Sequence, residues 1–101
     1  MVECHDAYEI ETAVDSGARI IGVNNRNLKD FSVDIELAGN LKNSVPAGVI
    51  FVSESGVKGT EDIKSVKKIG ADAVLIGEAL MRAEDKRMLL KSFRDAYEQS
   101  I

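Results

Sequence analysis

The sequence is poor in the residues that build disulfides, metal centres and membrane spans. It holds one cysteine, Cys4, and one histidine, His5, which excludes an internal disulfide and a zinc ligand set. Its unbroken apolar runs are only a few residues long, whereas a membrane-spanning helix needs about 20. With 13 Lys and Arg against 17 Asp and Glu, the net charge is −4, which argues against nucleic acid or an anionic membrane as a partner. Any basic site must therefore be local.

The residues that are present have the composition of an ordinary globular domain. Hydrophobic side chains make up 45% and charged side chains 30% of 101 residues, enough for a single domain over 1–101. Strand-like sequence begins at Val2 with no signal region before it, so we expect a cytoplasmic protein. The same abrupt start leads us to expect that upstream sequence has been cut away or was never encoded.

Strand and helix patterns alternate along the chain four times. Short β-branched runs predict strands, and apolar residues at helical spacing, with caps at Asp6 and Thr60, predict helices. The expected strands are 1–4, 19–23, 49–53 and 73–76, and the expected helices are 6–17, Ser32 or Asp34 to Lys42, 60–70, a short turn at 79–81, and a last helix from Asp85. Connections this short predict right-handed crossovers and parallel strands, and hence an α/β fold.

Polar residues follow three of the predicted strands. These loops are Asn24-Asn25-Arg26-Asn27, Glu54-Ser55-Gly56 and Gly77-Glu78. The carboxyl ends of parallel strands open at one edge of a sheet, where loop N–H groups can meet an anion. We therefore expect the three loops to share one face and to form the reactive edge of the protein.

Four motifs in register resemble the C-terminal half of indole-3-glycerol phosphate synthase, a (β/α)8 TIM barrel of tryptophan biosynthesis. They are Val2-Glu3-Cys4-His5-Asp6, Gly22-Val23-Asn24-Asn25-Arg26-Asn27-Leu28, Ser53-Glu54-Ser55-Gly56-Val57 and Gly77-Glu78-Ala79-Leu80-Met81-Arg82. The resemblance implies a half-barrel made of strands five to eight, each followed by a helix. The family closes the ring of a carboxyphenylamino-deoxyribulose phosphate with loss of carbon dioxide and water, and it needs no metal or organic cofactor.

The resemblance gives four polar residues roles in acid–base chemistry and substrate binding. It implies that Glu3 acts in the dehydration, that Glu54 positions polar groups of the substrate, and that Asn24 holds its hydroxyls or anilino group. Arg26 would bind the substrate carboxylate with its planar guanidinium. The alternatives are two solvated glutamates, a turn-forming asparagine and a surface salt bridge. Asn25 and Asn27 are interpreted as turn formers, and Cys4 and His5 as structural.

The resemblance places phosphate binding in the loops after the last two strands. Barrel enzymes bind phosphate there with backbone N–H groups and a short extra helix, which predicts Ser55, Gly56, Gly77 and Glu78 as the site, with residues 79–81 as the helix. The carboxylate of Glu78 cannot itself bind phosphate. The alternative for the glycines is simple turn geometry, which does not conflict with the function.

The departure from the family is large, because a complete barrel has about 250 residues. In the family the catalytic lysines lie on the early strands, so we expect the isolated chain to be inactive. Two alternatives stay open, a noncatalytic phosphate-binding or self-assembling module and one subunit of a split enzyme. Half a barrel exposes two sheet edges and inward side chains such as Ile20, Val52 and either Val74 or Leu75. We therefore expect a homodimer or a missing N-terminal half-barrel as partner.

Overall fold

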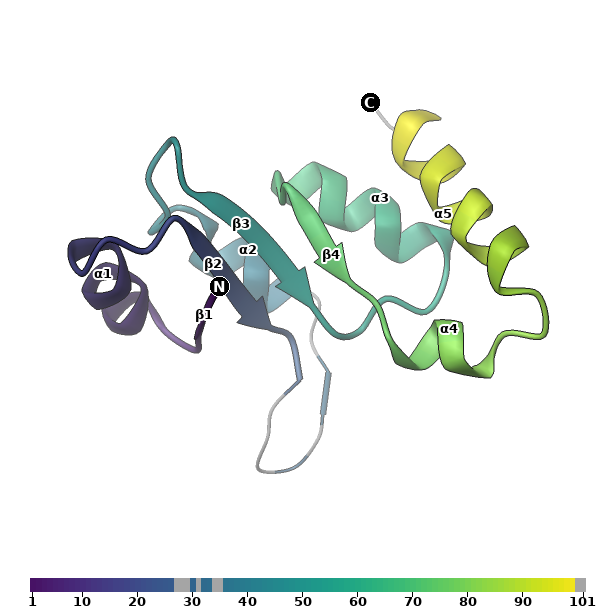
Figure 1. The fold of residues 1–101 in the computed structure, drawn as a ribbon, viewed down its shortest axis with the longest axis horizontal. Helices are drawn as coiled ribbons and strands as arrows, with labels where there is room; N and C mark the ends of the chain where they lie inside the picture. Colours follow the sequence, from purple (N-terminus) through teal and green to yellow (C-terminus); the bar gives the residue numbers. More distant parts are fainter. Residues whose placement is uncertain (27–29, 31, 34–35, 100–101) are drawn as a thin grey trace.

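The computed structural model describes residues 1–26, 30, 32–33 and 36–99, and within them strands and helices alternate (Figure 1). The strands are β1 (Val2–Cys4), β2 (Ile20–Asn24), β3 (Ile50–Glu54) and β4 (Ala73–Leu75). The helices are α1 (Ala7–Asp15), α2 (Glu36–Lys42), α3 (Thr60–Ile69), α4 (Glu78–Arg82) and α5 (Lys86–Gln99). None of the helices in the described ranges is long and apolar enough to span a bilayer.

The strands form one parallel sheet in chain order, β1-β2-β3-β4, as predicted. Ile21 lies beside Val2 and Phe51, and Val52 lies between Gly22 and Ala73. Each strand thus pairs only with its neighbours in the chain, and β1 and β4 are the two edges. This is the open sheet expected of half a (β/α)8 barrel.

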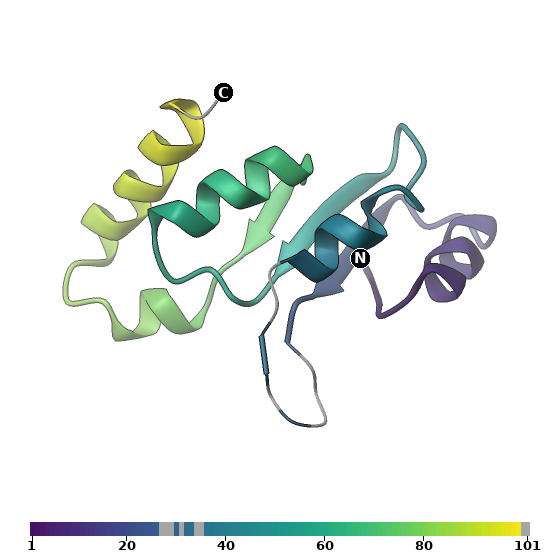
Figure 2. The same cartoon turned by 180° about the vertical axis from the view of Figure 1, so that it is seen from behind.

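Helices α2 and α3 cover one face of the sheet, as the view from behind shows (Figure 2). Side chains alternate along a strand, so Ile21, Val23 and Phe51 point to these helices and are fully buried. Helix α5 packs on α3 through its buried Phe93. Asp72 fixes the start of β4, because its N–H donates to the Phe51 carbonyl (2.8 Å) and its carboxylate accepts from the Phe51 N–H (2.9 Å).

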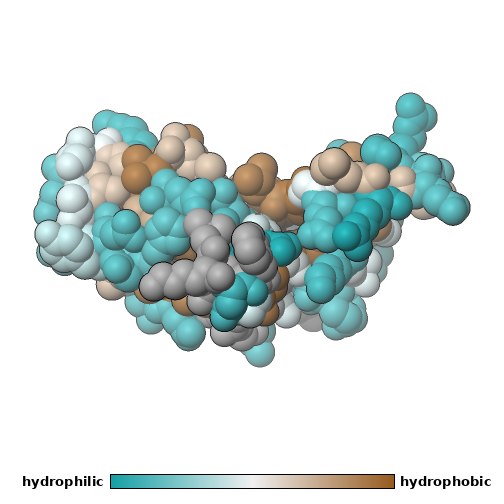
Figure 3. Space-filling view, turned by 90° about the horizontal axis from the view of Figure 1, so that it is seen from below, coloured by the Kyte–Doolittle hydropathy of each residue, from teal (hydrophilic) through white to brown (hydrophobic). Residues whose placement is uncertain are grey.

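The opposite face of the sheet, here called the helix-free face, carries no helix in the described structure (Figures 1 and 2). By register it presents Glu3, Ile20, Gly22, Asn24, Ile50, Val52, Glu54, Ala73 and Leu75. On this face Ile50 is 46% exposed and Leu75 is 54% exposed. Of the two residues offered for the inward-facing position of the last strand, it is therefore Leu75 that lies on this face, because Val74 packs against the core. A space-filling view from below shows apolar side chains gathered in a hollow between the two ends of the molecule (Figure 3).

Two starts were predicted for the second helix. The start at Ser32 is wrong, and the start at Asp34 lies outside the described residues. Ser32 is not helical, because its N–H and hydroxyl donate to the Asp30 carboxylate (2.9 and 2.7 Å). Val33 instead forms an antiparallel bridge with Arg26. Within the described residues, helix α2 runs from Glu36 to Lys42.

One of the two predicted helix caps differs. The cap of α3 is Gly59 and not Thr60, because the Asp62 carboxylate accepts from the N–H groups of Lys58 (2.9 Å) and Gly59 (3.2 Å). Asp6 does cap α1, accepting from the Glu9 N–H at 2.8 Å. The Glu9 carboxylate, however, accepts from the N–H of His5 rather than from that of Asp6.

Candidate functional site

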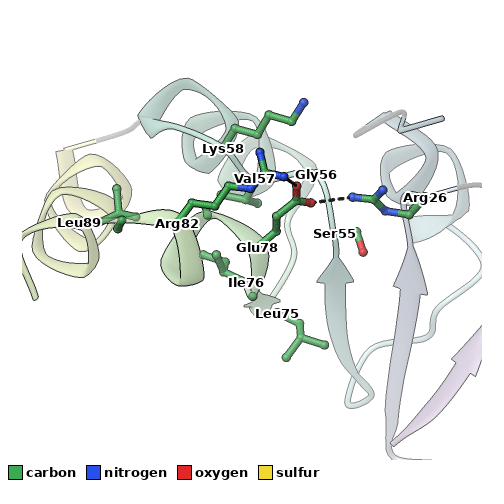
Figure 4. Close-up of a pocket in the computed structure, with 13 residues that line it drawn as sticks. Arg26, Ser55, Gly56, Val57, Lys58, Leu75, Ile76, Glu78, Arg82 and Leu89 are labelled. Atoms are coloured by element: carbon green, nitrogen blue, oxygen red, sulfur yellow. Dashed lines mark hydrogen bonds and ion pairs between the residues drawn. The ribbon is translucent and has the colours of Figure 1, made fainter. Parts of the chain in front are cut away.

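Loops from the carboxyl ends of β2, β3 and β4 surround one pocket of about 840 Å³ (Figure 4). The predicted residues Arg26, Ser55, Gly56, Gly77 and Glu78 all line it. Lys58 and Arg82 also line it. The polar loops predicted to share one face thus surround a single cavity with three basic side chains, although the whole chain is acidic.

The turn after β3 has an unusual backbone. Ser55 has a φ of 68° and Gly56 a φ of 87°, and Ser55 is the one non-glycine residue in the described ranges with a positive φ. A left-handed conformation costs a non-glycine residue free energy, so neighbouring contacts must hold it. Both residues of this turn, Ser55 and Gly56, line the pocket.

Asn25 holds that turn from beneath, a role that sequence reasoning missed. Its side chain is 1% exposed, and its Nδ2 donates to the Ser53 hydroxyl (2.9 Å) and to the Ser55 carbonyl (3.2 Å). Its Oδ1 accepts from the Ala38 N–H at 3.1 Å, and its own N–H donates to the Glu54 carbonyl at 2.8 Å. The interpretation of Asn25 as a mere turn former is wrong, because this amide ties together β2, β3 and α2.

Glu78 is ion-paired with two arginines across the pocket (Figure 4). Its Oε2 lies 3.0 Å from the Arg26 guanidinium, and its Oε1 lies 3.0 Å from that of Arg82, one turn along α4. The backbone of Arg26 is fixed in turn, since its N–H donates to Asn24 Oδ1 at 2.9 Å. The alternative role of Arg26, a salt bridge, is therefore present in the structure. The alternative role of Asn24, a turn former, is present as well.

The predicted acid–base residues lie on the helix-free face of the sheet, outside the lining of this pocket. Glu54 is 5% exposed, so it is not a solvated glutamate, and its Oε2 is buried with no hydrogen-bond partner in the described structure. The carboxylate lies over Gly22: a Cβ built there would be 2.5 Å from Glu54 Oε2. Gly22 has no positive φ, so what this glycine supplies is space for the carboxylate.

The environment of Glu54 favours its protonated form. Burial raises the pKa of its carboxyl, and the negative charge of Glu3 on the neighbouring edge raises it further, while His5 opposes the rise. Glu3 itself is more open, with 39% of its side chain exposed, and lies 3.5 Å from His5, which also contacts Glu9 at 3.2 Å. A carboxyl that keeps its proton to higher pH can donate it, as general acid chemistry requires.

The predicted site thus divides into two adjoining parts. Arg26, Ser55, Gly56, Gly77 and Glu78 meet in the pocket, whereas Glu3, Asn24 and Glu54 lie outside its lining. Lys58 and Arg82 were not predicted as pocket residues. The basic charge of Lys58 beside the glycine turn, and that of Arg82 on the short helix, are sequence signals that could have indicated them. Among the described residues, no group of three or more His, Cys, Asp or Glu side chains is placed to hold a metal ion.

Comparison of the sequence with known proteins gives one consistent result. A family model described as indole-3-glycerol phosphate synthase matches residues 1–93. Proteins of that name from Acetivibrio thermocellus and Ruminiclostridium cellulolyticum are each 50% identical over 94 residues, which is 93% of this chain and 36% of either relative. The chain thus spans about a third of the length of the relatives that it matches.

Solved structures show the fold. A thiamine phosphate pyrophosphorylase from Pyrococcus furiosus superimposes with a TM-score of 0.78 at 24% identity, over 96% of this chain and 47% of that one. The Amycolatopsis orientalis BexX/CysO complex gives a TM-score of 0.75 at 20% identity, over 92% of this chain and 38% of that one. With the family model matching all but the last eight residues, the chain belongs to the indole-3-glycerol phosphate synthase family.

Proposed function

We propose that this chain supplies the anion-binding pocket and part of the acid–base site for the family reaction, the decarboxylating and dehydrating ring closure of a carboxyphenylamino-deoxyribulose phosphate. The observation that carries the proposal is the buried, partnerless Glu54 carboxyl beside a basic pocket. A buried acid beside a basic pocket is what a proton transfer on a phosphorylated substrate requires.

The pocket would bind the phosphate of that substrate. Ser55, Gly56 and Gly77 line it, and glycine lets an anion approach backbone N–H groups closely. Arg26 would bind the second anionic group, the carboxylate, through its guanidinium. Glu3 and Glu54 would exchange protons with the substrate, and Asn24 would orient its hydroxyls or anilino group. The proposal includes no metal or organic cofactor, and a cytoplasmic location stays a prediction.

The chain should not turn over substrate alone, because no residue of the helix-free face is a lysine, the general acid that the resemblance implies. We expect no indole fluorescence when the carboxyphenylamino substrate is added to the purified chain. Adding a polypeptide with the region that precedes the match in the Acetivibrio thermocellus relative should produce fluorescence. Glu54→Gln should remove that gain, and Glu11→Gln, the same charge change on exposed α1, should keep it.

The possible outcomes separate the proposal from its alternatives. A family-like rate from the chain alone would show that the other strands are dispensable. No rate in the mixture, with phosphate still bound at Ser55 and Gly77, would favour a noncatalytic phosphate-binding module. Turnover in the mixture favours one subunit of a split enzyme.

In the absence of such a partner we propose that two copies cover each other. Ile20, Ile50 and Leu75 are at least 37% exposed on the helix-free face, and burying one such side chain is worth about 1.5–3 kcal/mol. The edges β1 and β4 are unpaired in this structure, and neither holds a proline that would block pairing with another chain. A two-fold dimer is the simplest assembly that buries the apolar side chains and pairs the strand edges.

Light scattering at micromolar concentration should give a mass near twice 11.0 kDa. Replacing Leu75 with lysine should shift the mass toward the monomer, since a charge would then lie in the covered face. Replacing Met88, an exposed apolar residue on α5, with lysine should leave the mass unchanged. A wild-type monomer that unfolds cooperatively would contradict the dimer.

A further inference from the structure

The most constrained charge cluster in the pocket is Glu78 with its two arginines. The carboxylate accepts from Arg26, on the loop after β2, and from Arg82, on α4, at 3.0 Å in each case. The three side chains close one side of the pocket that Ser55, Gly56 and Gly77 also line (Figure 4). One acidic side chain thus engages two of the three basic side chains of the pocket.

The chemistry of this cluster is that of a bound anion. A guanidinium presents planar N–H donors that suit carboxylate and phosphate oxygens alike. The Glu78 carboxylate uses one oxygen for each arginine, as a ligand anion between the same two side chains would do. It also places a negative charge beside the pocket, which opposes the entry of a second anion.

The contacts are open enough to exchange. The side chain of Glu78 is 54% exposed, that of Arg26 is 31% exposed and that of Arg82 is 80% exposed. Exposed ion pairs add little to stability, so a ligand that binds Arg26 loses little by breaking one. Glu78 can keep Arg82 when it releases Arg26, because the two residues are four positions apart on one helix and remain neighbours.

We propose that Glu78 is an internal competitor, whose carboxylate occupies Arg26 until a phosphate or carboxylate group of the ligand displaces it. Glu78 then sets the affinity of the pocket for anions and favours ligands with enough negative charge to exchange with it. This deepens the proposed function and rests on it, since the anion-binding pocket is the same. It also gives a role to the Glu78 side chain, whose carboxylate cannot itself bind phosphate.

Titration of the full chain with inorganic phosphate at constant ionic strength tests the competition. Backbone amide shifts at Ser55, Gly56 and Gly77 report binding in the pocket. Glu78→Gln should bind phosphate about two- to fivefold more tightly than the wild type. An exposed ion pair is worth up to about 1 kcal/mol, which corresponds to a change in affinity of about fivefold. Glu78→Ala should show the same gain, because both variants lose the carboxylate.

Glu84→Gln is the matched control, because it makes the same change in net charge a few residues away and Glu84 takes part in none of the described ion pairs. It should leave the phosphate affinity within about 1.5-fold of wild type, a change expected from screened long-range charge. Adding Arg26→Gln to Glu78→Gln should remove the gain, since the competition is for Arg26.

The outcomes separate this inference from the proposed function. Equal affinities for Glu78→Gln and Glu84→Gln, with shifts at the pocket amides, would overturn the competition and leave the phosphate pocket standing. A gain that persists without Arg26 would overturn it as well. Phosphate shifts at none of these amides in any variant would overturn both the competition and the phosphate pocket.

Discussion

Replacing Glu54 with glutamine should stabilise the folded chain at neutral pH, on the order of 1 kcal/mol, because burial disfavours the charged carboxylate and glutamine carries no charge. Glu54 Oε2 is buried without a hydrogen-bond partner in the described structure, and it carries part of a negative charge when the carboxyl is ionised. Glutamine keeps nearly the same shape without the charge. A residue that we propose for acid–base chemistry would then be stabilising to remove, as is common where activity requires a strained site.

The gain should depend on pH in a defined direction. Burial and Glu3 raise the pKa of Glu54 in the folded chain above its ordinary value of 4.5. The folded state therefore holds this proton more tightly than the unfolded state, and wild-type stability falls as pH rises from about 4.5 through the raised pKa. The difference between Glu54→Gln and wild type should be small at pH 4 and reach its full size above that window.

Urea unfolding at fixed protein concentration, between pH 4 and pH 8, measures this difference. Glu11→Gln serves as the control, since it removes one negative charge from an exposed position on α1. Its stability difference from wild type should change little over the same range. A Glu54→Gln variant that is less stable than wild type at pH 8 would show that the carboxylate has a stabilising partner.

Gly22→Ala should displace the Glu54 carboxylate. The new methyl group would lie 2.5 Å from Oε2 and 3.1 Å from Cδ of Glu54, so this side chain must move. Movement toward solvent lowers the pKa of Glu54 toward its ordinary value, because burial is the main cause of its rise. If the carboxylate cannot leave, overpacking should cost about 1–3 kcal/mol instead.

A carbon-detected NMR titration of the Glu54 carboxyl measures the pKa, and urea unfolding measures the cost. Gly77→Ala is the control, because a Cβ there meets nothing within 4 Å. Alanine at position 22 should cost less when residue 54 is also alanine, since the methyl group then has room. An unchanged Glu54 pKa, with equal costs in both backgrounds, would contradict the idea that Gly22 makes space for this carboxylate.

Elements that depend on local pattern were predictable from the sequence. The β-branched runs predicted the strands to within about one residue. The helix predicted from Thr60 ends at Ile69 and is capped by Gly70, which has a φ of 92° that glycine adopts without strain. The polar loops predicted to meet do meet, because parallel strands leave no other place for their carboxyl ends.

Features that depend on long-range contacts were not predictable. Nothing near Asn25 in the sequence distinguishes it from Asn24, yet its amide reaches Ser53 and Ser55, about 30 positions away. The bridge between Arg26 and Val33 is a pairing that has no propensity signal. That Glu54 extends over Gly22 follows from strand register, which the sequence of either strand alone does not determine.

The pairing of each strand with its neighbours in the chain has a consequence for how the sheet forms. Val2 pairs with Ile21, Ile21 with Phe51 and Val52 with Ala73, so each ladder closes a loop of 19, 30 or 21 positions. The entropy lost on closing a loop grows slowly with its length, so these three closures cost nearly the same. The sheet can therefore begin at any adjacent pair and grow in either direction, as a repeat protein does. A closed barrel must also pair its first strand with its last, which is a slow step because the two are distant in the sequence. The four strands of this chain can pair with one another without that step.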